Sequence, residues 1–157
     1  MTINDLSVNF NHLDRDTLLS EWKWLAEESK RPIMITKAGD AFLQDTESMA
    51  VFFLDTVNGK LEEVAENGSK FQELLSKVDF VMDKFSVNLV APLLKSGDQL
   101  PEGSLYGWKT LPVLGGEYSN ENLEPTDIEV HFSITGQIWD QVKDLPPGTK
   151  IEDIQFE

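Results

Sequence analysis

The side chains of this sequence that we consider for catalysis are those of histidine, serine, aspartate and glutamate. The chain contains no cysteine, which excludes a thiol nucleophile. Its two histidines, His12 and His131, lie far apart and form no HExxH or similar metal-binding pattern. No serine stands in a GxSxG turn, and the carboxylates form no DxDxDG loop of the kind that binds calcium. The sequence therefore nominates no catalytic residue, no metal ligand and no cofactor.

The segment LPVLGGEYSNENLEPTD, residues 111–127, contains a glycine pair that could be taken for a phosphate-binding loop. Such a loop leads from a strand directly into a helix and usually supplies a lysine. Here Gly115 and Gly116 are followed by Glu117, whose carboxylate would repel a phosphate. We therefore interpret the glycines as residues of a tight turn, and the segment as an acidic connector.

Charge is the strongest global signal of the chain. It contains 13 Lys and Arg against 28 Asp and Glu, which gives a net charge of −15. Residues 117–157 hold ten of the carboxylates and only two basic residues, Lys143 and Lys150. Because nucleic acid is bound by clustered Lys and Arg, this composition argues against a nucleic-acid partner. The acidity indicates either a soluble surface without a specific partner or a surface for a basic protein.

The length of 157 residues fits one domain, residues 1–157, with a sizeable hydrophobic core. The start, MTINDLSVNF, lacks the cationic and apolar regions of a secretory signal. No stretch approaches the roughly 18 apolar residues of a membrane span. We therefore expect no membrane association and a cytoplasmic protein.

The elements around these residues can be read from periodicity and turn signals. Residues 14–28 repeat Leu18, Trp22 and Leu25 at helical spacing, which predicts a helix. The runs IMIT, AFLQ, MAVFFLD and KLEEV then indicate four short strands, separated by turn residues that include the Asn58-Gly59 pair. Together they predict an antiparallel meander.

The second half of the chain mixes helices and strands. Ser69 opens a predicted helix, and residues 80–96 indicate another helix that Pro92 must kink or restart. Residues 104–109 read as a strand. The alternation in IEVHFSI, residues 128–134, also predicts a strand, with His131 on its polar side in a hydrogen-bonded structural role. A helix and a last strand, KIEDIQF, complete an α+β fold in which helices cover an antiparallel sheet formed by the meander and C-terminal strands.

The region from Tyr106 to Ile151 carries a set of motifs in order: PVLGGEY, EPTD, VHFS, GQI and VKDLPPGT. On these motifs the chain closely resembles the C-terminal domain of the Tdi-type immunity proteins of type VI secretion systems. The likeness extends upstream through RPIMITKAGDAFL and FFLDTVNGKLEEVA. It implies a protein that binds a DNase toxin delivered between bacteria and keeps the toxin inactive in the producing cell.

The resemblance and the charge point to the same partner, a basic toxin that is a nuclease. An acidic inhibitor can complement the positive groove that a nuclease needs for its phosphate substrate. We expect the contact surface to combine the acidic connector with a tryptophan anchor, on a monomer or weak homo-oligomer. The candidate partner-binding residues are Glu117, Tyr118, Glu121, Glu124, Asp127, Glu129, Trp139 and Asp140.

Other interpretations of these residues stay open from the sequence. The connector could be structural, with Glu117 and Asp127 buried against backbone amides, and Trp139 could be a residue of the core edge. A small-molecule binding or regulatory domain would require a large apolar pocket with convergent polar groups. An enzyme would require an enclosed pair of a carboxylate and His131 with strongly shifted pKa values.

Overall fold

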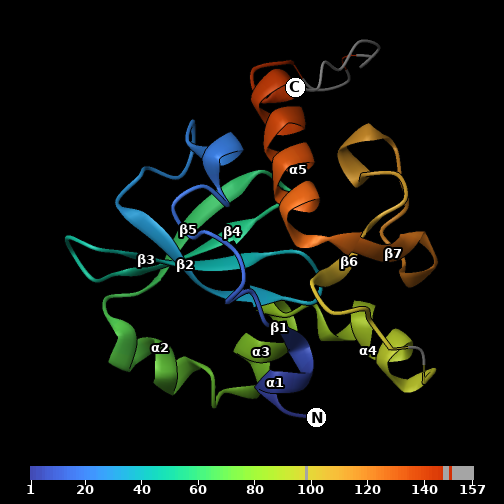
Figure 1. The fold of residues 1–157 in the computed structure, drawn as a ribbon, viewed down its shortest axis with the longest axis horizontal. Helices are drawn as coiled ribbons and strands as arrows, with labels where there is room; N and C mark the ends of the chain where they lie inside the picture. The colour runs from blue at the N-terminus through green and yellow to red at the C-terminus, as the bar shows by residue number, and fades with distance from the viewer. Residues whose placement is uncertain (98, 147–148, 150–157) are drawn as a thin grey trace.

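The computed structural model describes residues 1–97, 99–146 and 149, and places a five-stranded antiparallel sheet at the centre of the fold (Figure 1). The strands pair in chain order: β1 (Ser7–Val8), β2 (Lys30–Thr36), β3 (Ala41–Asp45), β4 (Val51–Asp55) and β5 (Lys60–Ala65). The expected four-stranded meander is therefore confirmed, and the two-residue strand β1 extends it at the free edge of β2.

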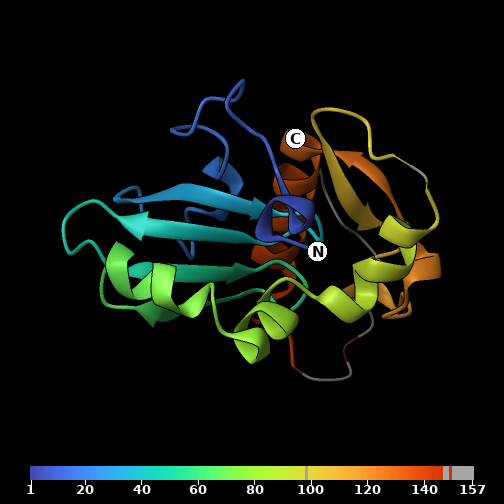
Figure 2. The same ribbon diagram turned by 90° about the horizontal axis from the view of Figure 1, so that it is seen from below.

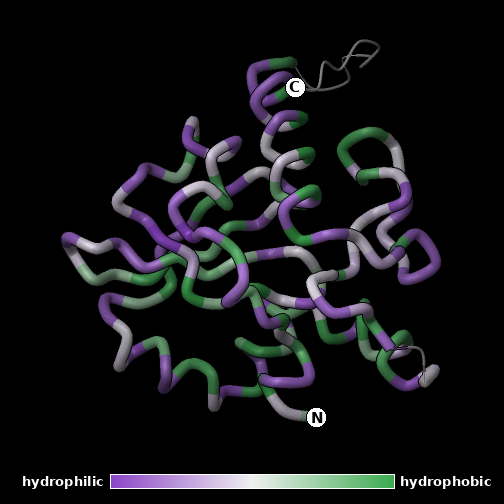
Figure 3. The backbone as a smooth tube through the Cα atoms, in the orientation of Figure 1, coloured by the Kyte–Doolittle hydropathy of each residue, from purple (hydrophilic) through white to green (hydrophobic). Residues whose placement is uncertain are grey.

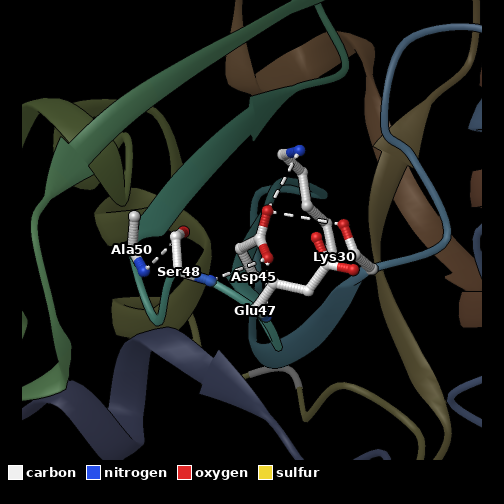
Figure 4. A network of polar contacts seen from close by, with 6 residues as sticks. Lys30, Asp45, Glu47, Ser48 and Ala50 are labelled. Atoms are coloured by element: carbon white, nitrogen blue, oxygen red, sulfur yellow. Dashed lines mark hydrogen bonds and ion pairs between the residues drawn. The ribbon is translucent and has the colours of Figure 1, made fainter.

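The turn between β3 and β4 shows how local polar residues fix the register of this sheet (Figure 4). The carboxylate of Asp45 accepts hydrogen bonds from the backbone amides of Glu47 (2.8 Å) and Ser48 (3.2 Å). It also pairs with the ammonium group of Lys30 on β2 at 3.5 Å. These bonds, the amides first, hold the pKa of Asp45 below its usual value. The turn at residues 45–48 is thus stabilised by an Asp side chain that accepts hydrogen bonds from the backbone amides of the turn.

Alternation along the strands sends large apolar side chains to both faces of the sheet. Phe42 and Phe53 belong to one hydrophobic cluster, whereas Leu43 and Leu54 belong to another. Because successive side chains of a strand point to opposite faces, the sheet separates these two clusters. In Figure 3, hydrophilic residues lie along many of the outer turns.

The first face is covered by three short helices, α2 (Gly68–Leu74), α3 (Val78–Lys84) and α4 (Val87–Lys95). Figure 2 shows them in a row across one side of the sheet, with α5 behind it. The ring of Phe42 lies 4.8 Å from that of Phe71 and 5.5 Å from that of Phe85, so aromatic packing attaches the helices to the sheet.

The helical region predicted at residues 80–96 is interrupted, but not at Pro92. Pro92 lies inside α4, while the chain breaks at Ser86, which takes a left-handed conformation with φ of 49°. Further upstream, the cap of α2 is Asn67 and not the expected Ser69: the Asn67 side chain accepts a 2.9 Å hydrogen bond from the Lys70 amide. The helical regions predicted from Ser69 and over residues 80–96 are therefore present, but the Asn67 cap and the Ser86 conformation set their boundaries.

The second face is covered by α5 (Ile128–Val142) and by residues 10–26. The prediction of a strand over residues 128–134 is wrong, because Asp127 caps a helix there and Ile128, Phe132 and Ile138 fall on its buried side. The prediction of a helix over residues 14–28 is also wrong. That segment consists of turns and one 3₁₀ turn, η1 (Ser20–Trp22), although Leu18 and Trp22 are buried as their pattern suggested.

A second, two-stranded sheet stands beside the main one. It joins β6 (Ser104–Trp108), which confirms the strand predicted there, to β7 (Leu123–Asp127), which lies inside the predicted connector. The amide of Tyr106 donates to the carbonyl of Lys37 at 2.8 Å, linking β6 to the β2–β3 turn. The last predicted strand, KIEDIQF, lies outside the described residues. None of the helices in the described part of the chain has the length and apolar character of a membrane span.

Candidate partner-binding surface

The side chain of Asn122 bridges the loop between β6 and β7, residues 109–122. The Asn122 side-chain amide donates to the carbonyls of Thr110 (2.7 Å) and Glu117 (2.8 Å), and its oxygen accepts from the Thr110 amide (3.1 Å). A Cβ on Gly116 would stand 1.9 Å from the Thr110 carbonyl oxygen, so only glycine fits. The structure therefore confirms that the glycine pair serves turn geometry, and Gly115 adopts a φ of 98°.

The loop presents its charged residues outward. Glu117, Tyr118 and Glu121 are exposed, and the Tyr118 side chain, 60% exposed, lies with its ring 5.4 Å from that of Trp108. The buried arrangement that a purely structural connector would give Glu117 is not present. Its carboxylate stands in solvent on a loop whose backbone is fixed.

The acidic stretch continues along β7 into the first turn of α5. Glu124, Asp127 and Glu129 are exposed. The Asp127 carboxylate accepts a 3.0 Å hydrogen bond from the Val130 amide, so it caps the helix while remaining accessible to solvent. Negative charge at this position also suits the positive end of the helix dipole, which explains how the chain concentrates carboxylates here. We call Glu117, Tyr118, Glu121, Glu124, Asp127 and Glu129 the acidic face.

The other two candidates lie at the far end of α5. Trp139 follows Glu129 by ten positions, which corresponds to about 15 Å along a helix. The Trp139 indole N–H donates to the Thr56 carbonyl at 3.0 Å, and the ring packs against Gly59. Asp140 is exposed and pairs with Lys143. The structure thus divides the candidates into the acidic face and a separate helix-end corner, Trp139 and Asp140, in which the tryptophan already has an internal role.

A buried polar cluster that includes His131 lies beneath α5. From the sequence, His131 was expected on the polar side of a strand. The His131 Nε2 atom is 2.7 Å from the Gly39 carbonyl oxygen, and the Asp40 carboxylate accepts from the Thr56 amide (2.9 Å) and hydroxyl (3.1 Å). Both titratable side chains are only 4% exposed. The cluster joins the β2–β3 turn, the β4–β5 turn and α5.

The electrostatics of this cluster favour neutral groups. Burial raises the pKa of Asp40 to about 8, with the Asp55 carboxylate adding to the rise, and burial lowers the pKa of His131 to about 4. Shifted, enclosed groups of this kind are what an enzyme would need, but here each is bonded to turn backbone and shielded from solvent. Both are therefore neutral near pH 7, in an arrangement that fits the hydrogen-bonded structural role expected for His131.

Sequence reasoning did not identify Asp40 and Thr56 as members of this cluster. Both are ordinary turn residues, and their burial depends on α5, whose His131 lies about 75 positions after Thr56 and about 90 after Asp40. Within the described residues, no group of three or more His, Asp or Glu side chains is placed to hold a metal ion.

Comparison with known protein families found a match for this chain. Residues 65–139 match the family described as T6SS immunity protein Tdi1, C-terminal. The resemblance drawn from the motifs is confirmed over these residues, which contain PVLGGEY, EPTD, VHFS and GQI. The Tdi1 C-terminal match runs from the end of β5 into α5, so it contains the whole acidic face and Trp139. It indicates an immunity role, the neutralisation of a toxin.

Solved structures include a similar fold, the crystal structure of Atu4351 from Agrobacterium tumefaciens. It aligns with a TM-score of 0.58 and 16% sequence identity, covering 78% of this chain and 62% of that one. At this identity the likeness concerns the fold alone, and this chain spans less than two thirds of the other. A search of curated protein sequences found no match.

Proposed function

We propose that this protein is a cytoplasmic immunity protein that binds a basic nuclease toxin and keeps it inactive. The observation that carries the proposal is the coincidence of the Tdi1 C-terminal match with the exposed acidic face, both within residues 65–139. The protein performs no catalysis of its own and needs no cofactor in this proposal. It acts by occupying the toxin.

Electrostatics supply the mechanism. A nuclease must present a positive groove to its phosphate substrate, and the acidic face offers carboxylates to the same groove. Long-range attraction then accelerates encounter and disfavours partners that are not basic. The Asn122 bonds to the carbonyls of Thr110 and Glu117 fix the backbone of the loop, so the loop loses little backbone entropy when its carboxylates meet a partner.

The helix-end corner is proposed as a second point of contact. Trp139 is partly buried against Gly59, and Asp140 stands in solvent beside it. A partner that spans the length of α5 would cover both the acidic face and this corner, which would suit occlusion of a cleft better than a single small contact.

The association rate with the full-length protein encoded beside this gene tests the proposal. Stopped-flow mixing at low and high NaCl should show a rate that falls steeply with salt, whereas sucrose of equal osmolality should not reproduce the fall. A plasmid-degradation assay with the same pair should show nuclease activity that this protein suppresses. A rate indifferent to salt would refute steering by the acidic face, and a partner without nuclease activity would refute the toxin class.

A further inference from the structure

Helix α3 is the most exposed helix on its side of the sheet. None of its seven residues is buried, and two of its apolar side chains, Val78 and Met82, are 73% and 37% exposed. Residues four apart in a helix share one face, so these side chains form an apolar ridge at the surface. An exposed ridge of this kind marks a contact surface more often than an isolated apolar residue does.

A groove of about 630 Å³ runs along one side of this ridge. Asp79, Met82 and Asp83 of α3 line one wall, and Tyr118 and Asn120 of the β6–β7 loop line the other. Tyr118 belongs to the acidic face, so the groove continues that face onto the helical side of the molecule. We call this feature the α3 groove.

The wall of the α3 groove that α3 supplies carries two carboxylates, Asp79 and Asp83. Asp83 pairs with Lys84 at 3.4 Å, and Lys84 also bonds to Glu62 on β5. Asp79 has no cation within ion-pair distance among the described residues, and it stands in solvent. A group entering between Asp79 and Tyr118 would therefore meet an unpaired carboxylate beside an aromatic ring.

On the other side of α3 lies an apolar groove of about 360 Å³, which α3 shares with helix α1 (Ile3–Leu6). Ile3, Leu75 and Val81 contribute to its lining, and Met82 borders both grooves. The ridge thus separates a charged channel from an apolar one. A partner with only charged side chains, or only apolar ones, would leave half of this surface unused.

We infer that the α3 groove receives a segment of the toxin that places a Lys or Arg beside Asp79 and an aliphatic or aromatic side chain on Met82. The inference rests on the proposed function and adds a second contact surface to it, joined to the acidic face through Tyr118. Charge complementarity selects this occupant: a second copy of this chain would bring a net charge of −15 to an acidic groove. Nucleic acid is disfavoured for the same reason.

Two variants and a matched control test the inference with the full-length protein encoded beside this gene. Asp79→Lys and Met82→Ser should each weaken binding at physiological salt by about tenfold or more in calorimetry, because both change the proposed contact. Glu47→Lys alters the net charge as much as Asp79→Lys but lies in the β3–β4 turn, so it should change affinity by less than about threefold. All three positions are exposed, so thermal melts should stay close to the parent.

A crosslinking experiment checks the location independently of stability. Benzoylphenylalanine in place of Asn88, an exposed residue that lines the α3 groove, should crosslink to the same protein on irradiation, and the same group at Glu47 should not. If the parent binds while Asp79→Lys and Met82→Ser bind like Glu47→Lys, the inference fails and the proposed function stands. If the parent does not bind, both fail. A dimer lost in Met82→Ser without a change in toxin affinity would assign the ridge to self-association instead.

Discussion

The indole of Trp139 packs so closely on Gly59 that a Cβ added to the glycine would stand 2.5 Å from the ring. Gly59 also has a φ of 64°, in the turn between β4 and β5. The contact joins the end of α5 to a turn some 80 residues earlier, next to the hydrogen bond from the indole to Thr56. It makes the tryptophan part of the fold whether or not it also meets a partner.

Gly59→Ala is expected to lower the free energy of unfolding by about 2 kcal/mol or more, because it combines a left-handed backbone with a clash against Trp139. Gly97→Ala is the matched control: Gly97 has a φ of 84°, but nothing lies within 4 Å of its added Cβ. That variant should lose only about 1 kcal/mol from backbone strain. Urea unfolding of both proteins gives the difference, and equal losses would show that the ring yields freely.

Trp139→Phe separates the internal role of this side chain from a role in binding. Phenylalanine retains an aromatic ring over Gly59 but cannot donate to the Thr56 carbonyl, so we expect a loss of about 1 to 2 kcal/mol in stability. If Trp139 anchors the partner, affinity for the protein encoded beside this gene should fall as well, by about tenfold. Unchanged affinity in a folded variant would remove Trp139 from the partner-binding surface.

The buried carboxyl of Asp40 predicts a dependence of stability on pH. Its pKa rises from 3.8 in the unfolded chain to about 8 in the fold, so the folded state holds the extra proton between these values and stability falls as pH rises through them. His131 acts in the opposite sense, because its lowered pKa removes stability as pH falls from 6.5 to about 4. Between pH 6.5 and 8, Asp40 should therefore change the stability with pH while His131 does not.

Asp40→Asn should abolish this slope. In the parent, the free energy of unfolding should fall between pH 6.5 and 8 by up to about 1.4 kcal/mol per pH unit. The asparagine oxygen can still accept from the Thr56 amide and hydroxyl, so the variant should retain the hydrogen bonds and lose the titration. Chemical denaturation at several pH values measures both slopes. A parent whose stability is flat across this range would contradict a neutral, buried Asp40.

The main sheet could be predicted from the sequence because its signals are local. Alternation in AFLQ and VFFLD, the Asp45 turn and the Asn58-Gly59 pair each act over a few residues. The strand β7 could not be predicted, since LEPTD contains a proline and little alternation, and it is a strand only because β6 pairs with it. Glu117 and Glu121 are charged, so their exposure could be predicted from the sequence. The hydrogen bonds of Asn122 could not, because they depend on its position beside Thr110 in the fold.

Helix α5 shows where periodicity misleads. Ile128, Val130, Phe132 and Ile134 alternate as in a strand, yet the buried set in the structure includes Ile128, Phe132, Thr135 and Ile138, at steps of three and four. Val130 is exposed, so its place in the alternation was coincidence. The Asp127 cap was the available signal, since Asp before an apolar run favours a helix start. The depth of His131 and the pairing of Trp139 with Gly59 depend on contacts between distant segments, which no local pattern encodes.

Alanine substitutions of the two adjacent glycines in the loop between β6 and β7 should affect the loop to different extents. Gly116→Ala places a methyl group against the Thr110 carbonyl, so the loop must move and the Asn122 bonds must lengthen or break. Gly115→Ala also strains a left-handed residue, but meets nothing within 4 Å. Hydrogen exchange at residues 109–122 should therefore accelerate about tenfold more in Gly116→Ala than in Gly115→Ala. Equal acceleration would mean that strain, and not close approach, shapes the loop.

The final prediction concerns which carboxylates steer the toxin. The triple variant Glu117→Gln, Glu121→Gln and Glu124→Gln removes three charges from the acidic face. Its control removes three exposed charges from the β3–β4 turn and the region of β5, at Glu47, Glu63 and Glu66. At low salt the first variant should associate with the protein encoded beside this gene about tenfold more slowly than the parent, and the control about as fast as the parent.

At high salt the three rates should converge, because screening removes long-range attraction and leaves the short-range contacts. Stopped-flow fluorescence measures the association rates, and dissociation rates measured alongside show whether short-range contacts also changed. If both triple variants slow association equally, net charge and not its placement governs encounter. The acidic face would then be an ordinary part of a negative surface, and the contact site would have to be sought through the α3 groove and the helix-end corner.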